Sequence, residues 1–174
     1  MYGIGIKNPN ADKEADLPSF TITGKKQDGS IVFNDQQTLF VIAPNETVYY
    51  GFQAGNGTAP DTVEFAIDDC SFSDCGTPDS ETFTITNTSE VPGDFGMSSY
   101  TGEATLNLDL SGSSSPELLE QTAVTVILRD AEGQIVYGMS TFVNTPDQGE
   151  SVPFEVSAYS VPEHASYELY AQLW

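Results

Sequence analysis

The sequence predicts an all-β protein made of two tandem β-sandwich domains, and three features support this prediction. Short runs of alternating apolar and polar residues recur along the 174-residue chain, as half-buried strands require. Glycine and proline, with 15 and 10 residues, separate these runs at short intervals. The runs also repeat along the chain. Residues 116–122 are the only segment that we expect to form a helical turn.

An internal repeat divides the predicted strands into two copies. With an offset of 104 positions and no gap, residues 20–67 align with residues 124–171. Identical residues meet at several positions, among them Gly29 with Gly133, Ile31 with Ile135, Glu46 with Glu150, Val48 with Val152, and Glu64 with Glu168. A fixed period of this kind indicates that one structural unit occurs twice.

Each copy has the same predicted order of strands and turns. A first strand enters a hairpin turn centred on Gly29 or Gly133, where glycine supplies the positive φ of a tight turn. Alternation along the strands predicts that Tyr49 and Tyr170 point outward. It also predicts the core residues, which are Ile22, Val48, Tyr50 and Phe65 in the first copy and Val126, Val152, Phe154 and Leu169 in the second.

The predicted domains are residues 1–69 and residues 83–174, joined by a linker at 70–82. The linker contains the only two cysteines, Cys70 and Cys75. Two cysteines without histidine partners are too few for a structural zinc site, and their spacing is not that of a redox pair. We expect a local disulfide in an oxidising compartment. The alternative is a pair of reduced thiols in a surface loop.

The charge balance excludes some partners. The chain has 26 acidic residues against four lysines and one arginine, for a net charge of −21. Such a surface repels nucleic acid and disfavours anionic membranes. It suits a soluble exported or salt-adapted protein, or alternatively carboxylates that bind calcium. No window of eighteen apolar residues could span a membrane. We expect the signal segment or anchor of an exported protein to lie outside this sequence.

One loop carries oxygen side chains at alternate positions, namely Asn8, Asn10, Asp12 and Glu14. This spacing resembles the start of a calcium-binding loop, in which alternate side chains turn onto one ion. The glycine of the EF-hand turn is missing, and Lys13 occupies its place. These four residues are candidate calcium ligands, and a solvated loop between the first two strands is the alternative.

The sequence contains no recognisable catalytic constellation. The single histidine, His164, has no second histidine or cysteine near it in the sequence, and we expect it in a solvent-exposed turn. No nucleophile elbow, phosphate-binding loop or dinucleotide fingerprint occurs. We therefore expect no catalytic residue, no cofactor and no enzymatic activity. A carbohydrate-binding surface is left as an alternative, since sugars stack on exposed rings; the aromatic residues that could form it are Tyr49, Tyr100, Tyr137, Tyr159, Tyr170 and Trp174.

Two segments of the second copy resemble a known family. Residues 126–136, Val-Ile-Leu-Arg-Asp-Ala-Glu-Gly-Gln-Ile-Val, and residues 148–154, Gln-Gly-Glu-Ser-Val-Pro-Phe, are similar to the signature stretches of FxLYD-type immunoglobulin-like domains. The likeness covers residues 100–174. The first copy departs from it, with Gly24-Lys25-Lys26 in place of Leu128-Arg129-Asp130.

Domains of this family occur in exported lipoproteins and surface proteins of bacteria and archaea, often in tandem and usually without an assigned activity. The resemblance therefore implies two immunoglobulin-like β-sandwich domains. It further implies an extracytoplasmic, non-catalytic module that acts as a spacer or as a protein-interaction surface. The alternative is a glycan-binding or calcium-dependent adhesion module. The sequence identifies neither a protein partner nor a cell-surface ligand.

Overall fold

The computed structural model describes residues 1–75, 81–111 and 119–174. These residues form strands joined by turns, with a short 3-10 turn at Asp94–Gly96, and they contain no α-helix. No helix that is long and apolar enough to cross a membrane occurs in these residues. Of the helical turn expected at 116–122, residues 116–118 lie outside the described residues, Leu119 has 3-10 conformation, and Gln121 and Thr122 begin a strand. Part of the linker predicted at 70–82 also lies outside the described residues.

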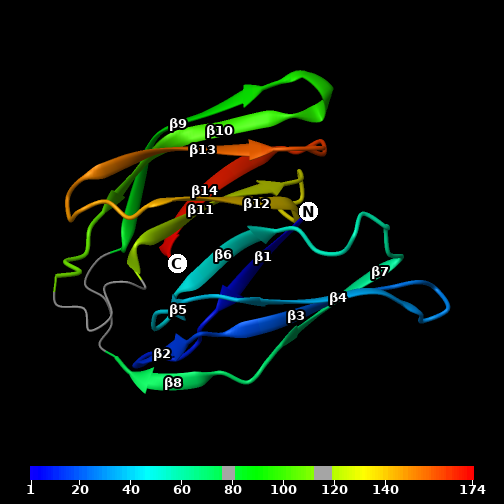
Figure 1. The fold of residues 1–174 in the computed structure, drawn as a ribbon, viewed down its shortest axis with the longest axis horizontal. Coiled ribbons are helices and arrows are strands. Elements are labelled where there is room, and N and C mark those ends of the chain that lie inside the picture. Colours follow the sequence, from blue (N-terminus) through cyan, green and yellow to red (C-terminus); the bar gives the residue numbers. More distant parts are fainter. Residues whose placement is uncertain (76–80, 112–118) are drawn as a thin grey trace. The chain divides into compact units, whose positions relative to one another are not determined.

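The strands alternate in chain order with tight turns and short loops (Figure 1). Their bounds are β1 Tyr2–Lys7, β2 Lys13–Asp16, β3 Ser19–Lys25, β4 Ile31–Thr38, β5 Val41–Ile42, β6 Thr47–Phe52, β7 Thr62–Ile67, β8 Ser71–Asp74, β9 Phe83–Pro92, β10 Ser98–Leu106, β11 Gln121–Arg129, β12 Ile135–Asn144, β13 Ser151–Ala158 and β14 Ser166–Leu173.

The chain divides into two compact units by its contacts. Unit 1 comprises Met1–Ile6, Val48–Phe52 and Pro78–Trp174, and unit 2 comprises Lys7–Thr47 and Gln53–Thr77. The division differs from the predicted boundary at residue 69, because most of β1 and β6 belongs with the second half of the chain. Sequence alternation assigns residues to strands, but it does not show against which sheet a strand packs.

Unit 1 contains two three-stranded antiparallel sheets that supply one hydrophobic core. Their strand orders are β13-β10-β9 and β12-β11-β14. Fully buried Tyr100 and Val156 come from the first sheet, and Val124, Val126 and Leu128 come from β11 in the second. Alternate residues of each strand therefore meet in a core between the two sheets.

Both faces of β11 are buried. Its other face carries Ala123, Thr125 and Ile127, each no more than 1% exposed. On that side Gly51 of β6 lies so close to β12 that an added Cβ would come 2.1 Å from the backbone nitrogen of Met139. Gly3 of β1 and Gly138 of β12 approach each other in the same way. Glycine is required at this crossing because side chains would separate the backbones.

Unit 2 consists of two smaller antiparallel sheets, with strand orders β4-β3-β7 and β5-β2-β8. Its buried apolar side chains include Ala15, Phe20, Ile22, Phe33, Leu39 and Ile42. Strand β8 lies in the segment predicted as a linker, where it pairs with β2 from Lys13↔Asp74 to Asp16↔Ser71. Residues 71–74 of the predicted linker are thus a strand of this unit.

The repeat recurs in register at its offset of 104. Gly24 pairs with Phe33 and Leu128 pairs with Tyr137, and each pair is followed by a β-bulge. The third strands of these sheets, β7 and β14, also pair at the same offset, since Phe20 pairs with Ile67 and Val124 pairs with Ala171. The turns also match, with positive φ at Gly29 and Gly133 and again at Asn45 and Gly149. The prediction of one repeated strand-and-turn unit is confirmed for these strands.

The predicted core is confirmed at most positions and wrong at Phe65. Ile22, Val48, Tyr50, Val126 and Phe154 are buried, and Val152 and Leu169 are half-buried. Phe65 on β7 is 48% exposed. Its counterpart Leu169 lies on β14, which contacts β9 in unit 1. Both β7 and β14 are edge strands of their sheets. The difference is that Leu169 packs against the core of unit 1, whereas Phe65 remains open to solvent.

Candidate functional site

The predicted calcium loop is organised around the buried side chain of Asn8. The Asn8 amide nitrogen donates to the carbonyl oxygens of Lys13 and Ile42, at 2.7 and 3.0 Å. Its Oδ1 accepts from the backbone and side-chain nitrogens of Asn10, at 3.1 and 2.9 Å. Asn8 is 3% exposed. Its polar atoms are therefore used to close the loop, which accounts for an asparagine at this position.

The backbones of Asp12 and Glu14, two other candidate calcium ligands, pair with the segment at residues 73–75. The carbonyl oxygen of Asp12 accepts from the amide of Cys75. Glu14 lies on β2 opposite Ser73. Across residues 1–75, 81–111 and 119–174, no three His, Cys, Asp or Glu side chains are grouped closely enough to hold a metal ion. In the described structure the alternate spacing of Asn8, Asn10, Asp12 and Glu14 thus corresponds to a hydrogen-bonded loop and the start of a strand.

The predicted disulfide between Cys70 and Cys75 is wrong for this structure, in which neither cysteine is bridged. Strand β8 runs between them in extended conformation. An extended backbone rises about 3.3 Å per residue, so five steps separate the two Cα atoms by roughly 16 Å. A disulfide needs Cα atoms within about 7 Å. The two cysteines are close in the sequence but not in space, because pairing with β2 keeps the segment between them extended.

The environment of Cys75 disfavours its thiolate. Burial, followed by a hydrogen bond with Glu14 and the negative charges of Glu14 and Asp16, raises the pKa of the Cys75 thiol. A thiol of this kind is a poor nucleophile at neutral pH. The site is therefore not suited to thiol catalysis.

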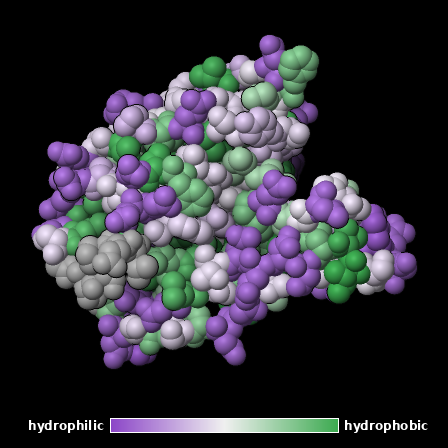
Figure 2. Space-filling model, in the orientation of Figure 1, coloured by the Kyte–Doolittle hydropathy of each residue, from purple (hydrophilic) through white to green (hydrophobic). Residues whose placement is uncertain are grey.

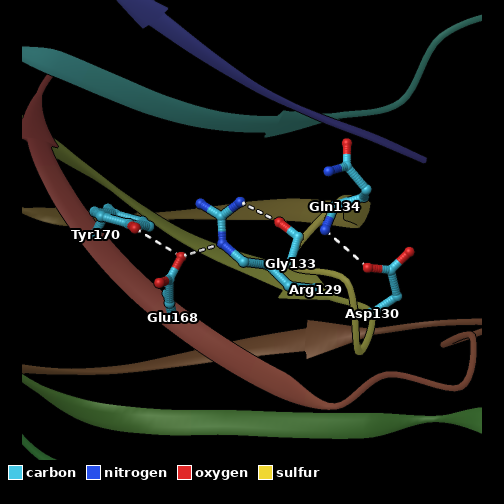
Figure 3. A network of polar contacts seen from close by, with 6 residues as sticks. All are labelled: Arg129, Asp130, Gly133, Gln134, Glu168 and Tyr170. Carbon is cyan, nitrogen blue, oxygen red and sulfur yellow. Dashed lines mark hydrogen bonds and ion pairs between the residues drawn. The ribbon is translucent and has the colours of Figure 1, made fainter.

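The densest polar network of unit 1 surrounds Arg129, the single arginine of the chain. Its Nε donates to Glu168 Oε2 at 2.6 Å, and its terminal nitrogen donates to the carbonyl oxygen of Gly133 at 3.1 Å. Figure 3 shows the guanidinium between Glu168 on β14 and the β11–β12 turn. Asp130 stabilises that turn by accepting from the backbone of Gln134 at 2.8 Å. The network joins the end of β11 to its neighbouring strand and turn.

Two tyrosines complete this network. The rings of Tyr49 and Tyr170 stack with their centroids 4.3 Å apart, and the Arg129 guanidinium lies 5.5 Å from the Tyr49 centroid. Tyr170 also donates to Glu168 at 2.8 Å. Both tyrosines are half-buried rather than freely exposed. Their rings pack on each other and on a cation of the same chain, so they do not present open faces on which a sugar could stack.

The protonation states in the network follow from these contacts. The hydrogen bond with Glu168 is the largest effect that raises the pKa of Arg129, which is charged throughout. Partial burial opposes ionisation of Glu168, but hydrogen bonds from Arg129 and Tyr170 outweigh it and lower its pKa. Burial and the bond to Glu168 raise the pKa of Tyr170 to about 12. The cluster is a permanently charged pair with a neutral phenol, and none of the three is a poised acid or base at neutral pH.

A second cluster surrounds His164, which sequence reasoning expects in an exposed turn. Its side chain is 15% exposed, and its Nε2 lies 3.3 Å from Glu90 Oε1. The same carboxylate oxygen accepts from the Tyr100 hydroxyl at 3.0 Å. His164 Nδ1 lies 3.0 Å from the carbonyl oxygen of Pro162. These contacts hold the imidazole between Glu90 of β9 and its own loop.

The Tyr100–Glu90–His164 cluster serves the interior of unit 1. Tyr100 is fully buried, and burial is the largest effect that raises its pKa. Its hydroxyl is thus inaccessible to a substrate. No local motif marks this cluster, because its members come from β9, β10 and the loop before β14. The Arg129 cluster did leave a signal, since the repeat aligns Arg129 with Lys25 and Glu168 with Glu64.

A pocket of about 330 Å³ opens on unit 1. Its lining includes the acidic residues Asp109, Glu120 and Asp147 beside Leu106 and Leu110. The lining residues do not include His164, Arg129 or either cysteine. Neither polar cluster described above therefore faces this pocket.

No family model matches the chain, and no curated protein sequence matches it significantly.

Proposed function

We propose that this chain is a non-catalytic module of an exported or cell-surface protein, built from two immunoglobulin-like β-sandwiches, which acts as a spacer or as a protein-interaction surface. The observation that carries the proposal is the repeat of one three-stranded sheet, β4-β3-β7 and β12-β11-β14, with identical pairing register. A chain that repeats its framework, including the turns, is typical of modular surface proteins. The resemblance of residues 100–174 to FxLYD-type domains supports the same proposal.

The polar clusters support a non-catalytic role. Tyr100, in the cluster with His164, is fully buried. In the other cluster, Arg129 and Tyr170 both donate hydrogen bonds to Glu168. Both clusters join strands of unit 1. A catalytic site needs a reactive group at an accessible position with a suitable pKa, and Arg129, Tyr170 and Tyr100 do not meet that requirement.

Exposed apolar side chains support a role in protein interaction. On unit 1, Phe95 is 99% exposed, and Val91, Met97 and Tyr159 are also large exposed hydrophobic residues. Val91 lies at the end of β9, Phe95 and Met97 lie in the β9–β10 connection, and Tyr159 lies in the loop after β13. This connection and this loop are joined by a hydrogen bond from the Val161 amide to the Gly96 carbonyl. On the face shown in Figure 2, hydrophobic residues are interspersed among hydrophilic ones. Contiguous exposed apolar residues mark protein-interaction sites, and the hydrogen bond between Val161 and Gly96 brings two of these segments together.

The proposed location rests on the acidic surface and on the family resemblance. A charge of −21 keeps a protein soluble and prevents nonspecific association with nucleic acid. The unbridged cysteines add no support for an oxidising compartment. Export is tested by expressing the gene in its own host and by locating the protein with an antibody in intact and lysed cells.

The function is tested by offering the whole chain three classes of ligand. A phage library of protein fragments, a glycan array and a calorimetric titration with CaCl₂ are compared at 0.15 M NaCl. We expect the library to yield reproducible fragments and the other two assays to give no saturable binding. Saturable binding of a glycan or of Ca²⁺, without any selected fragment, would replace this proposal by the adhesion alternative.

A further inference from the structure

Strand β1 holds the place in the first copy that β10 holds in the second. The amide of Asn8, directly after β1, donates to the carbonyl of Glu46, and the amide of Leu106, the last residue of β10, donates to the carbonyl of Glu150. Glu46 and Glu150 are partners in the repeat. Strand β1 pairs with β6 as β10 pairs with β13.

The two strands differ on their other edge. Strand β10 lies between β13 and β9, whereas β1 pairs with β6 alone within the described part of the chain. The strand order of unit 1 therefore contains a complete three-stranded sheet and a two-stranded version of the same arrangement. The missing member corresponds to β9.

Burial along the two strands reflects this difference. Counted back from Leu106, the alternate residues Ala104, Gly102 and Tyr100 are all buried. The corresponding residues counted back from Asn8 are Ile6, Ile4 and Tyr2, which are only half-buried. Gly5 and Lys7, between them, are exposed. The apolar side chains of β1 thus lack part of the cover that their counterparts on β10 have.

The backbone of β1 can accept another strand. In an antiparallel pair, successive residues direct their N–H and C=O groups to opposite edges. Because Asn8 faces β6, alternation directs Gly5 and Lys7 to the opposite edge. An exposed edge with such groups is a template for strand addition, in which backbone hydrogen bonds give affinity and alternate side chains give specificity.

We propose that the open edge of β1 binds an extended strand of a partner protein, which takes the place that β9 takes beside β10. This inference rests on the proposed role in protein interaction and identifies the surface and the kind of partner. Strand β9 shows which chemistry fits, because Phe83 and Ile85 alternate toward the core while Thr84 lies opposite Thr105 of β10. The partner strand has apolar residues at alternate positions.

Charge selects against a second copy of this chain as the occupant. Each chain has a net charge of −21, so two chains brought together at this edge would repel each other. The charge favours a partner with basic residues beside the strand, which would also speed association at low salt. The edge of β1 ends at Lys7, and basic flanks are best placed beyond it.

The probe is a synthetic peptide with the sequence of Phe83–Pro92, two added lysines and a fluorescent label. It is titrated with the whole chain and with two variants, Lys7→Pro and Lys7→Ala. Proline removes the backbone donor at the open edge and alanine keeps it, so we expect saturable binding that only Lys7→Pro weakens, by at least about tenfold. A peptide with proline in place of Thr84 is the matched ligand control, and we expect it not to bind.

A second measurement does not depend on the variants folding normally. Amide hydrogen exchange of the unchanged chain is followed with and without peptide, and we expect new protection at Gly5 and Lys7. Loss of protection at Thr84 and Thr86, which pair with Thr105 and Glu103 of β10, would mean that the peptide displaces β9, and this would overturn the proposal. A dimer of the free chain in sedimentation that Lys7→Pro abolishes would identify a second copy as the occupant and would also overturn it.

The outcomes separate this inference from the proposed function. If the fragment library yields binders but neither their affinity nor the peptide's responds to Lys7→Pro, the β1 edge is the wrong surface while the interaction role stands. If the fragment library yields no binder while a glycan or Ca²⁺ binds saturably, the proposed function fails, whether or not the peptide binds.

Discussion

Arg129 and Glu168 form an ion pair with 2.6 Å between Nε and Oε2, and Lys25 and Glu64 form the same pair in the first copy. The offset between the two pairs is 104 positions, as in the rest of the repeat. Each pair joins the last residue of one strand to the antiparallel neighbour on its outer side. The repeat therefore preserves an interaction as well as a hydrophobic pattern.

The two ion pairs are expected to differ in their contribution to stability. The Arg129 side chain is 19% exposed and also contacts Gly133 and the ring of Tyr49, whereas the Lys25 side chain is 31% exposed and its partner Glu64 is 61% exposed. We expect Arg129→Met to cost about 1–2 kcal/mol and Lys25→Met no more than about 0.5 kcal/mol. Urea unfolding of both variants measures the difference. Equal losses would contradict the assigned role of Tyr49 and Gly133.

Glu168 should make unfolding depend on pH in a defined direction. Despite partial burial, hydrogen bonds from Arg129 and Tyr170 hold its pKa below the ordinary value of 4.5. The folded state therefore binds this proton at lower pH than the unfolded state does. The resulting stability is present above pH 4.5 and is lost as pH falls through the folded pKa.

A Glu168→Gln variant isolates this contribution from the rest of the acidic surface. We expect the parent chain to be more stable at pH 7, with the difference shrinking as pH falls through the carboxyl range. Free energies of unfolding of both proteins at a series of pH values provide the measurement. A difference that stays constant with pH would show that Glu168 acts through packing instead of charge.

The sequence predicts local features of the fold well and long-range ones poorly. The turns at Gly29 and Gly133 depend on a few adjacent residues, so their positive φ was predictable. The register of the repeated sheets followed from an ungapped alignment. Strand β8 was missed because a polar, cysteine-containing segment became a strand through pairing with β2. Strand pairing between distant segments leaves little trace in a single sequence.

The candidate sites illustrate the same limit. Alternate oxygen side chains at Asn8 and Asn10 resembled metal ligands, but the Asn8 amide bonds carbonyl groups as distant as Ile42. His164 meets Glu90 only in the folded chain. The pair of Arg129 and Glu168 was accessible to sequence reasoning, because the repeat aligns a base with a base and Glu with Glu. Aligning the two copies of the repeat thus indicated more about this site than the spacing of single residues did.

The glycine crossing in unit 1 should tolerate no side chain. A Cβ at Gly51 would lie 2.1 Å from the Met139 nitrogen and 2.3 Å from the Gly138 carbonyl carbon. Because backbone atoms cannot move aside as a flexible side chain can, we expect Gly51→Ala to cost about 3 kcal/mol or more. Gly93→Ala is the control, since its Cβ would meet nothing nearer than 3.5 Å and its φ is −111°. Thermal unfolding should separate the two variants, and similar melting temperatures would refute the close approach.

The two copies should respond differently to the loss of a phenylalanine. Phe154 is 5% exposed and belongs to the core of unit 1, so Phe154→Ala should cost about 3–5 kcal/mol. Phe65 is 48% exposed on β7, and Phe65→Ala should cost less than about 1 kcal/mol. Denaturant titrations of both variants test this. A large loss for Phe65→Ala would mean that β7 is covered in solution.

The β9–β10 connection stores backbone strain that a single substitution should relieve. Phe95 has a φ of 59° while its side chain is 99% exposed. A left-handed conformation is unfavourable for phenylalanine, and asparagine tolerates it better. The exposed ring gains no burial in return, so we expect Phe95→Asn to stabilise the folded state by about 0.5–1 kcal/mol. Phe95→Ala serves as the control, because alanine removes the ring but keeps most of the strain, and the melting temperature of this variant should change little.

If the fragments selected by phage display contact this loop, Phe95→Asn should weaken their binding while it raises the melting temperature. This result would indicate that the strain is retained for interaction. A lower melting temperature for Phe95→Asn would show that the ring packs in solution and would refute this account.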